Sequence, residues 1–201
     1  MKRRDALGRV ALLMGGTLSA PTMLAFLESC KSASDTSTGG MTFPFSAERK
    51  NLVSEIAEII IPKTDTPGAK EAKVGEFIEK MLKDCYTGKD LESFEKGLKE
   101  IEKKDFLKAT PAEQTKILKE MEASAKEETN KAGEEKKKYT EAGKEYTDAG
   151  VPFFRLMKEL TLIGYFTSEP GATLALDYVP VPGRYDGCID LKPGQKAWAM
   201  S

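Results

Sequence analysis

Hydrophobic residues recur at three- and four-residue steps over most of the chain, which is the period of helices that bury one face. The pattern predicts a helix that begins at Ser46 and ends at Pro62, a second helix over residues 74–85, and a third that begins at Asp90. The loop between the first two is dense in proline, glycine and aspartate. We therefore expect these two helices to pack as a hairpin.

The fourth predicted helix has the clearest start. Thr110 can cap it, Pro111 suits the first helical position, and Glu113 can complete a capping box. From Glu122 to Asp148 fourteen of the 27 residues are charged, and only two tyrosines are large. We expect a solvated helical extension or hairpin here, and a charged arm that touches a partner is the alternative.

The segment after Pro152 is apolar around nearly its whole helical circumference, which predicts a helix buried on more than one side at the centre of the domain. Its large side chains are Phe153, Phe154, Leu156, Met157, Leu160, Ile163, Tyr165 and Phe166. The tail from Gly171 is rich in proline, glycine and aromatic residues without a periodic segment. It predicts an irregular strap over the helices, whose aromatics complete the core or, alternatively, form an interface.

Together these elements predict an all-α fold, a single irregular helical domain over residues 45–201 with a C-terminal strap and a charged insertion at 122–148. Residues 1–30 add an export leader with a basic start, an apolar middle and small residues before a break. The pair Arg3 and Arg4 is typical of a twin-arginine signal, which an export receptor reads as an address. A general secretory signal and a membrane anchor of marginal length are the alternatives.

Twin-arginine cargo is exported folded, usually because it has acquired a cofactor, so we expect an exported, periplasmic protein. Cys30 ends the apolar run as the lipidated cysteine of a lipoprotein does, although Glu28 departs from that pattern. Anchoring through a lipid on Cys30 therefore stands beside cleavage nearby and an uncleaved leader. Residues 31–44 follow as a flexible linker rich in serine, threonine and glycine.

The composition excludes most kinds of catalytic site. The chain has no histidine, which is the usual general base and a common metal ligand, and it has no dinucleotide, Walker or CxxC motif. After residue 30 it carries 27 basic and 30 acidic residues, so nothing favours nucleic acid as a partner. We expect no cofactor in this chain and name no catalytic residue.

Two cysteines remain in the domain. Export favours a disulfide between Cys85 and Cys188, which would tie the tail to an early helix. The alternative is that Cys85 is buried filler on an apolar helix face. A thiol redox enzyme is a further alternative, although neither cysteine has a CxxC neighbour or a histidine to lower its pKa.

Three blocks, IIPKTDTPGAKEAKVGEFIEKML, LTLIGYFTSEPGA and YVPVPGRYDGC, follow one another in register. Together with the leader they resemble gluconate 2-dehydrogenase subunit 3, the small subunit of a membrane-associated gluconate dehydrogenase, over about Phe45 to Cys188. The charged stretch at 122–148 departs from the family and looks like an insertion.

The resemblance implies a division of labour. A large flavoprotein of the glucose-methanol-choline type would hold FAD and oxidise a sugar, sugar acid or other alcohol, and electrons would pass to a cytochrome c subunit or another carrier. The small subunit would carry the export signal for both through the twin-arginine machinery. A stand-alone envelope lipoprotein that acts as a binding or structural module is the alternative function.

The matched blocks supply the candidate partner contacts. They are Thr64, Asp65, Thr66, Pro67 and Gly68 in the first block, Tyr165, Phe166, Thr167, Ser168 and Glu169 in the second, and Pro182, Gly183, Tyr185 and Gly187 in the third. Local roles are the alternatives, because Asp65 can cap the following turn and Ser168 and Glu169 can belong to a helix end stopped by Pro170 and Gly171.

Overall fold

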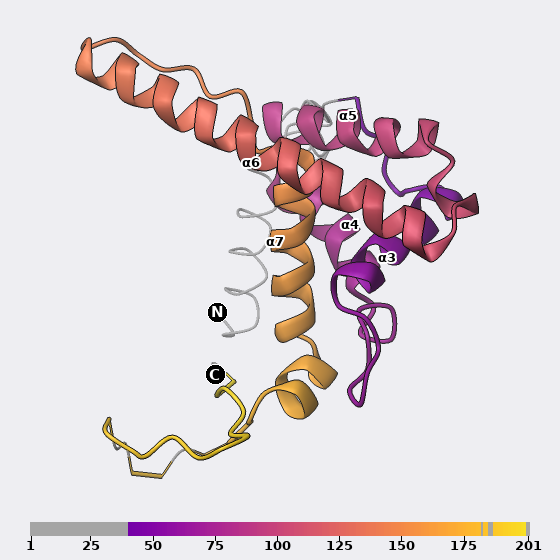
Figure 1. The fold of residues 1–201 in the computed structure, drawn as a ribbon, viewed down its shortest axis with the longest axis vertical. Coiled ribbons are helices and arrows are strands. Elements are labelled where there is room, and N and C mark those ends of the chain that lie inside the picture. Colours follow the sequence, from indigo (N-terminus) through magenta and orange to yellow (C-terminus); the bar gives the residue numbers. More distant parts are fainter. Residues whose placement is uncertain (1–39, 182, 185–186, 200–201) are drawn as a thin grey trace, which may run out of the picture. The chain divides into compact units, whose positions relative to one another are not determined.

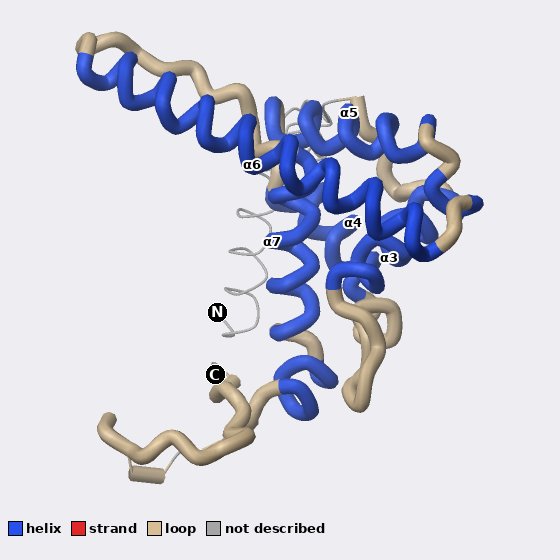
Figure 2. The backbone as a smooth tube through the Cα atoms, viewed as in Figure 1, coloured by secondary structure: helices blue, strands red, loops and turns tan. Residues whose placement is uncertain are grey.

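The computed structural model describes residues 40–181, 183–184 and 187–199, and the expectations for the leader, Cys30, Pro182 and Tyr185 lie outside them. Within the described residues the order is α3 (Ala47–Ile60), α4 (Val74–Cys85), α5 (Lys89–Lys103), the 3₁₀ turn η1 (Phe106–Lys108), α6 (Pro111–Glu141), α7 (Phe153–Phe166) and the π-helix η2 (Gly171–Ala175). This part of the chain contains no strand, as Figure 2 shows, so the predicted all-α class is confirmed.

The predicted hairpin of the first two helices is confirmed, because α3 and α4 pack against each other. The hydroxyl of Ser46 accepts the backbone N–H of Arg49 at 3.3 Å, which caps the start of α3. The helix ends at Ile60, two residues before Pro62. Both boundaries follow from the cap and the proline that the sequence supplies.

Helix α7 is the centre of the domain and contacts α3, α4, α5 and α6. Its buried residues are Phe153, Phe154, Leu156, Met157, Leu160, Thr161, Gly164 and Tyr165. The hydroxyl of Thr161, which is fully buried, donates to the Met157 carbonyl at 2.8 Å and is thereby satisfied. The predicted central helix is confirmed, but Ile163 and Phe166 are 48% and 41% exposed, so the expectation that they are buried is wrong.

A charged cluster links α3 to α5. The guanidinium of Arg49 donates to both carboxylate oxygens of Glu95, at 2.9 and 3.0 Å, and to Glu102 at 2.8 Å. Glu95 is only 4% exposed and also pairs with Lys99 at 3.1 Å. Paired in this way, the buried carboxylate of Glu95 keeps its hydrogen bonds inside the fold.

The start of α6 is the predicted capping box. The backbone N–H of Thr110 donates to the Glu113 carboxylate at 2.9 Å, and the Glu113 N–H donates back to the Thr110 hydroxyl at 3.4 Å. These bonds to the backbone and hydroxyl of Thr110 lower the pKa of Glu113. The reciprocal bonds satisfy N–H groups that the first helical turn leaves without partners.

The second half of α6 is the charged stretch. The helix continues through Gly133 to Glu141, and its only fully buried residues are Leu118 and Ala125. Figure 1 shows this half extending beyond the helices that α6 crosses, with a loop running back toward α7. The Tyr139 and Tyr146 rings meet edge to face at 5.7 Å across that return. A solvated helical extension is therefore confirmed.

The tail differs from the expected strap. Residues Gly171–Ala175 form the π-helix η2, a regular segment that the sequence reading missed. Tyr178 and Trp198 are 46% and 54% exposed, so the expectation that the tail aromatics complete the core is wrong for these two. The tail instead closes on itself, because the Asp177 N–H donates to Ala197 O at 2.8 Å and the Ala199 N–H donates to Asp177 O at 2.9 Å.

The expected disulfide is not present. Cys85 is an exposed thiol at the end of α4, with its Sγ 3.9 Å from the Met81 Sδ, and Cys188 is exposed in the tail. Cys85 is therefore neither bridged to Cys188 nor buried filler. The tail is held to itself by backbone hydrogen bonds rather than to α4 by a covalent link.

Two helical glycines differ in their surroundings, so together they distinguish the effect of packing on stability from the effect of helix propensity. Gly97 of α5 lies against Phe153, and a Cβ at this position would overlap the Phe153 side chain, whereas a Cβ at Gly133 of α6 would meet nothing within 4 Å. Glycine costs about 1 kcal/mol relative to alanine inside a helix. At Gly97 the helix bears this cost, because the missing side chain allows α5 to contact α7 closely.

We expect Gly97→Ala to lower the free energy of unfolding by about 1–3 kcal/mol, because overpacking exceeds the propensity gain. Gly133→Ala is the matched control and should raise it by up to about 1 kcal/mol. Urea unfolding followed by circular dichroism measures both. Stabilisation by Gly97→Ala would contradict the close packing of α5 on α7.

Candidate functional site

The loop between α3 and α4 is built around one carboxylate. The Glu58 side chain of α3 accepts the backbone N–H of Lys63 at 3.0 Å and of Lys70 at 2.8 Å. A Cβ at Gly68 would lie 2.6 Å from Glu58 Oε2 and 2.7 Å from the Lys63 nitrogen, so only glycine leaves room for the carboxylate. The sequence reading missed Glu58, because a glutamate on the polar side of a helix gives no signal of this role.

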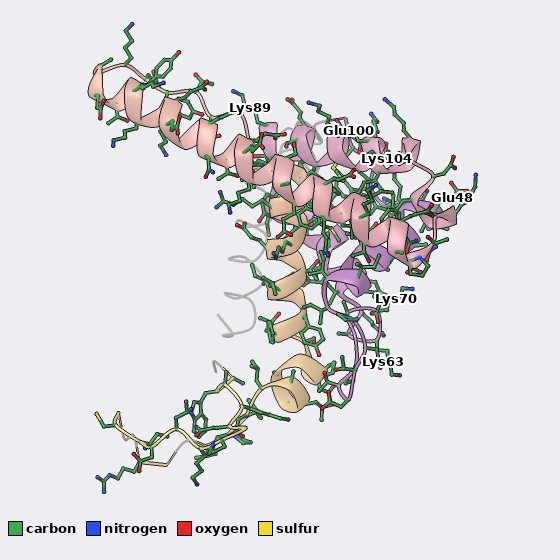
Figure 3. All side chains as sticks on the ribbon, in the orientation of Figure 1. Glu48, Lys63, Lys70, Lys89, Glu100 and Lys104 are labelled. Atoms are coloured by element: carbon green, nitrogen blue, oxygen red, sulfur yellow. The ribbon has the colours of Figure 1, made fainter. Side chains whose placement is uncertain are left out.

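Ion pairs flank the same loop. Lys63 pairs with Glu71, and this hydrogen-bonded pair raises the pKa of Lys63. Lys70 pairs with Glu55 of α3. Figure 3 labels Lys63 and Lys70, which lie on the loop at the edge of the helices. Because the four side chains are exposed or half-exposed, these pairs contribute little stability and mainly set the loop's surface charge.

The tip of the loop carries four of the predicted contact residues. The Thr64 N–H donates to the Thr66 carbonyl at 3.0 Å, and the Thr64 hydroxyl donates to the Asp65 carboxylate at 3.0 Å. Thr64 and Asp65 are exposed, and Thr66 and Pro67 are half-buried. The tip therefore presents hydroxyl and carboxylate groups to solvent in a defined turn.

Tyr165 joins this loop to α7. Its hydroxyl donates to the Pro67 carbonyl at 2.8 Å and lies 3.4 Å from the Thr66 hydroxyl. The structure thus brings together the first two predicted blocks, which are almost a hundred residues apart in sequence. Tyr165 itself is 2% exposed, so it positions the loop and is not available as a contact.

The end of α7 turns directly into η2. The Ser168 hydroxyl donates to the Tyr165 carbonyl at 2.6 Å and accepts the Gly171 N–H at 3.2 Å. A Cβ at Gly171 would overlap that same carbonyl oxygen. Helix α7 ends at Phe166, before Ser168 and Glu169, and Pro170 and Gly171 start a new helical turn, so the alternative that these two residues stop the helix is wrong.

The remaining predicted contacts differ in exposure. Phe166, Thr167 and Glu169 are exposed, and Thr167 donates to the Ile163 carbonyl at 2.6 Å. Gly183 and Gly187 are exposed in the tail, while Tyr185 and Pro182 lie outside the described residues. The first and second blocks form one site, and the third continues along the tail.

Exposed hydrophobic side chains follow this site along the chain, and of these only the tail aromatics had been considered for an interface. Of the twelve large hydrophobic side chains that are exposed in the described residues, ten fall between residues 162 and 198. We call these the apolar segment; its members are Leu162, Ile163, Phe166, Leu174, Tyr178, Val179, Val181, Ile189, Leu191 and Trp198. The signal was present, because a helix that is apolar all round must bury its outer face against something.

The site exposes hydroxyl, carboxylate and hydrophobic groups, at Thr64, Asp65 and Phe166 among others. The described residues contain no group of three or more cysteine, aspartate or glutamate side chains arranged to hold a metal ion. Among the helices of the described ranges, none combines the length and hydropathy needed to cross a membrane. A groove of about 570 Å³ lies elsewhere, between α3 and η1, and its Arg49 is already held by Glu95 and Glu102.

Comparison of the chain with known protein families finds a match to one family. The family model described as gluconate 2-dehydrogenase subunit 3 matches residues 47–183, which span all the helices from α3 to η2 and the first part of the tail. No curated protein and no solved structure matches the chain.

We expect Tyr165→Phe to loosen the α3–α4 loop, because it removes the hydrogen bond to Pro67 and leaves that carbonyl without this donor. The free energy of unfolding should fall by about 0.5–1.5 kcal/mol, and amide exchange at Thr64 and Ala69 should accelerate. Tyr178→Phe, at a 46% exposed tyrosine of the tail, is the control and should change neither. Unchanged exchange in Tyr165→Phe would contradict the positioning role.

Proposed function

Because the chain belongs to the gluconate 2-dehydrogenase subunit 3 family, we propose that it is the small, non-catalytic subunit of a dehydrogenase complex and the export escort of its large subunit. The observation that carries this proposal is the family match over residues 47–183, which covers more than half of the chain. The match includes the α3–α4 loop, the end of α7 and most of the first half of the tail.

The proposed partner is a large flavoprotein of the glucose-methanol-choline type. It would hold FAD and oxidise a sugar, a sugar acid or another alcohol, and a cytochrome c subunit or another carrier would accept the electrons. The present chain would supply no reacting group. Its contribution would be a surface to which the folded flavoprotein binds.

The candidate site supports a binding role. The α3–α4 loop is fixed internally by Glu58 and by the Tyr165 hydroxyl, so little of its conformational entropy remains to be lost on association. Beside it lies exposed apolar surface, which is the usual driving force for protein association. A rigid polar loop next to an apolar surface is the composition of a protein interface.

The proposed location is the periplasm, reached by the twin-arginine route with Arg3 and Arg4 as the recognised pair. Anchoring to the membrane through Cys30 or through a retained leader is part of the same proposal. The route accounts for the division of labour, because a flavoprotein that has bound FAD in the cytoplasm must cross the membrane folded. One signal on the small subunit would then serve both chains.

We expect the double variant Arg3→Lys, Arg4→Lys to leave both this chain and its flavoprotein in the cytoplasm. Arg9→Lys is the matched control within the leader and should not affect export. The measurement is the flavin content and dehydrogenase activity of the periplasmic and membrane fractions, in cells that express the chain together with a flavoprotein of the glucose-methanol-choline type from the same organism.

Deletion of this chain should remove the flavoprotein from the exported fractions. Unchanged export and activity after the deletion would contradict the escort role. A monodisperse monomer that never associates with a flavoprotein would instead favour the stand-alone envelope lipoprotein.

A further inference from the structure

We propose that the large subunit docks on the apolar segment, the exposed hydrophobic residues from the outer side of α7 through η2 to the tail. The inference rests on the proposed function and adds the surface through which the complex forms. It differs from the candidate contacts of the three sequence blocks, because only Phe166 belongs to both sets.

Exposed hydrophobic residues are distributed unevenly over the described chain. Outside the apolar segment only two large hydrophobic residues are exposed, Leu107 and Tyr139, whereas ten lie within it. Single exposed hydrophobics are ordinary on protein surfaces, but a concentration of them marks an interaction site. The segment also extends past the family-matched residues, which end at residue 183.

Helix α7 cannot rotate to bury its outer residues. Its inner side is already packed, since a Cβ at Gly164 would lie 2.6 Å from the Phe77 ring, and the Tyr165 hydroxyl is bonded to Pro67. Leu162, Ile163 and Phe166 stand at three- and four-residue spacing on the other side and are 39–48% exposed. These side chains can leave water only against a second molecule or another segment.

The tail cannot bury its own aliphatic residues. It is closed by the backbone bonds of Asp177 to Ala197 and Ala199, and Lys196 bonds to the Leu174 carbonyl. Between these ties Val181 and Leu191 remain 82% and 84% exposed. The closure fixes the ends of the tail and leaves its hydrophobic side chains directed to solvent.

The exposed area matches what a stable complex requires. Ten large side chains that are 37–84% exposed offer on the order of 100 Å² each, or roughly 1,000 Å² together. A standard interface buries about 800 Å² on each partner, and obligate interfaces are larger and more hydrophobic. The segment therefore offers an area of the size that one partner buries in a standard interface.

The large subunit is the occupant that the observations favour. The family is described as a subunit, which implies a larger partner chain to which we assign this area. An anionic membrane surface is disfavoured, because residues 162–199 carry four acidic and three basic side chains and so present no net positive charge. Of the two kinds of surface, a protein is therefore the one against which we expect these hydrophobic residues to be buried.

The test makes the same kind of substitution, an exposed hydrophobic residue to aspartate, inside and outside the apolar segment. We expect Ile163→Asp and Leu174→Asp, each at a position 48% exposed, to lower capture of a glucose-methanol-choline-type flavoprotein from the same organism at least tenfold. Leu107→Asp, at 41% exposure on η1, is the matched control and should capture it like the unmodified chain. The tagged full-length chain is used, the captured flavin is quantified, and urea midpoints check that each variant is folded.

The outcomes distinguish a failure of the proposed docking surface from a failure of the proposed function. If the unmodified chain captures the flavoprotein and both segment variants do so equally well, the docking surface is wrong and the proposed function stands. If the unmodified chain captures no flavoprotein, the proposed function and the inference fail together. A homodimer that Leu174→Asp dissociates, or binding to lipid vesicles that Ile163→Asp abolishes, would overturn the choice of occupant.

Discussion

The close packing of α7 against four other helices is the constraint on which the rest of the structure depends. Two glycines permit it, Gly97 on α5 facing Phe153 and Gly164 on α7 facing Phe77. Interiors are packed as densely as organic crystals, so a methyl group at either position would displace an aromatic ring. With the inner side of α7 fixed in this way, its outer side and the direction in which the chain leaves it are fixed as well.

The candidate site follows from that constraint. Since α7 is held in one rotation, the Tyr165 hydroxyl meets Pro67 and positions the α3–α4 loop, whose interior is filled by the Glu58 carboxylate. The same rotation leaves Leu162, Ile163 and Phe166 in water. A polar loop held by internal hydrogen bonds and a row of exposed hydrophobic residues on α7 are thus two results of one packing arrangement.

Periodicity and capping residues were sufficient to predict most of the fold. Ser46, Pro62 and Thr110 mark helix boundaries through local hydrogen bonds and backbone restrictions, and such local rules can be read from neighbouring residues.

The partners of α7 could not be read in the same way. Ile163 and Phe166 have the same hydropathy as buried residues, and their exposure depends on which side of α7 the other helices occupy. Glu58 was missed for a related reason, because its hydrogen bonds are to backbone groups up to twelve residues away.

The far half of α6 and its return loop have an architectural consequence. The base of this excursion is fixed by α5, where Lys89 bonds to the Asp148 carbonyl and the Asp90 carboxylate accepts the Val151 N–H. Because the chain re-enters the body at a point set by α5, helical turns at the far end of α6 can be gained or lost, together with residues of the return loop, without moving the start of α7. Variation in length is therefore confined to an appendage, and the packed body keeps the same register whatever the reach of that arm.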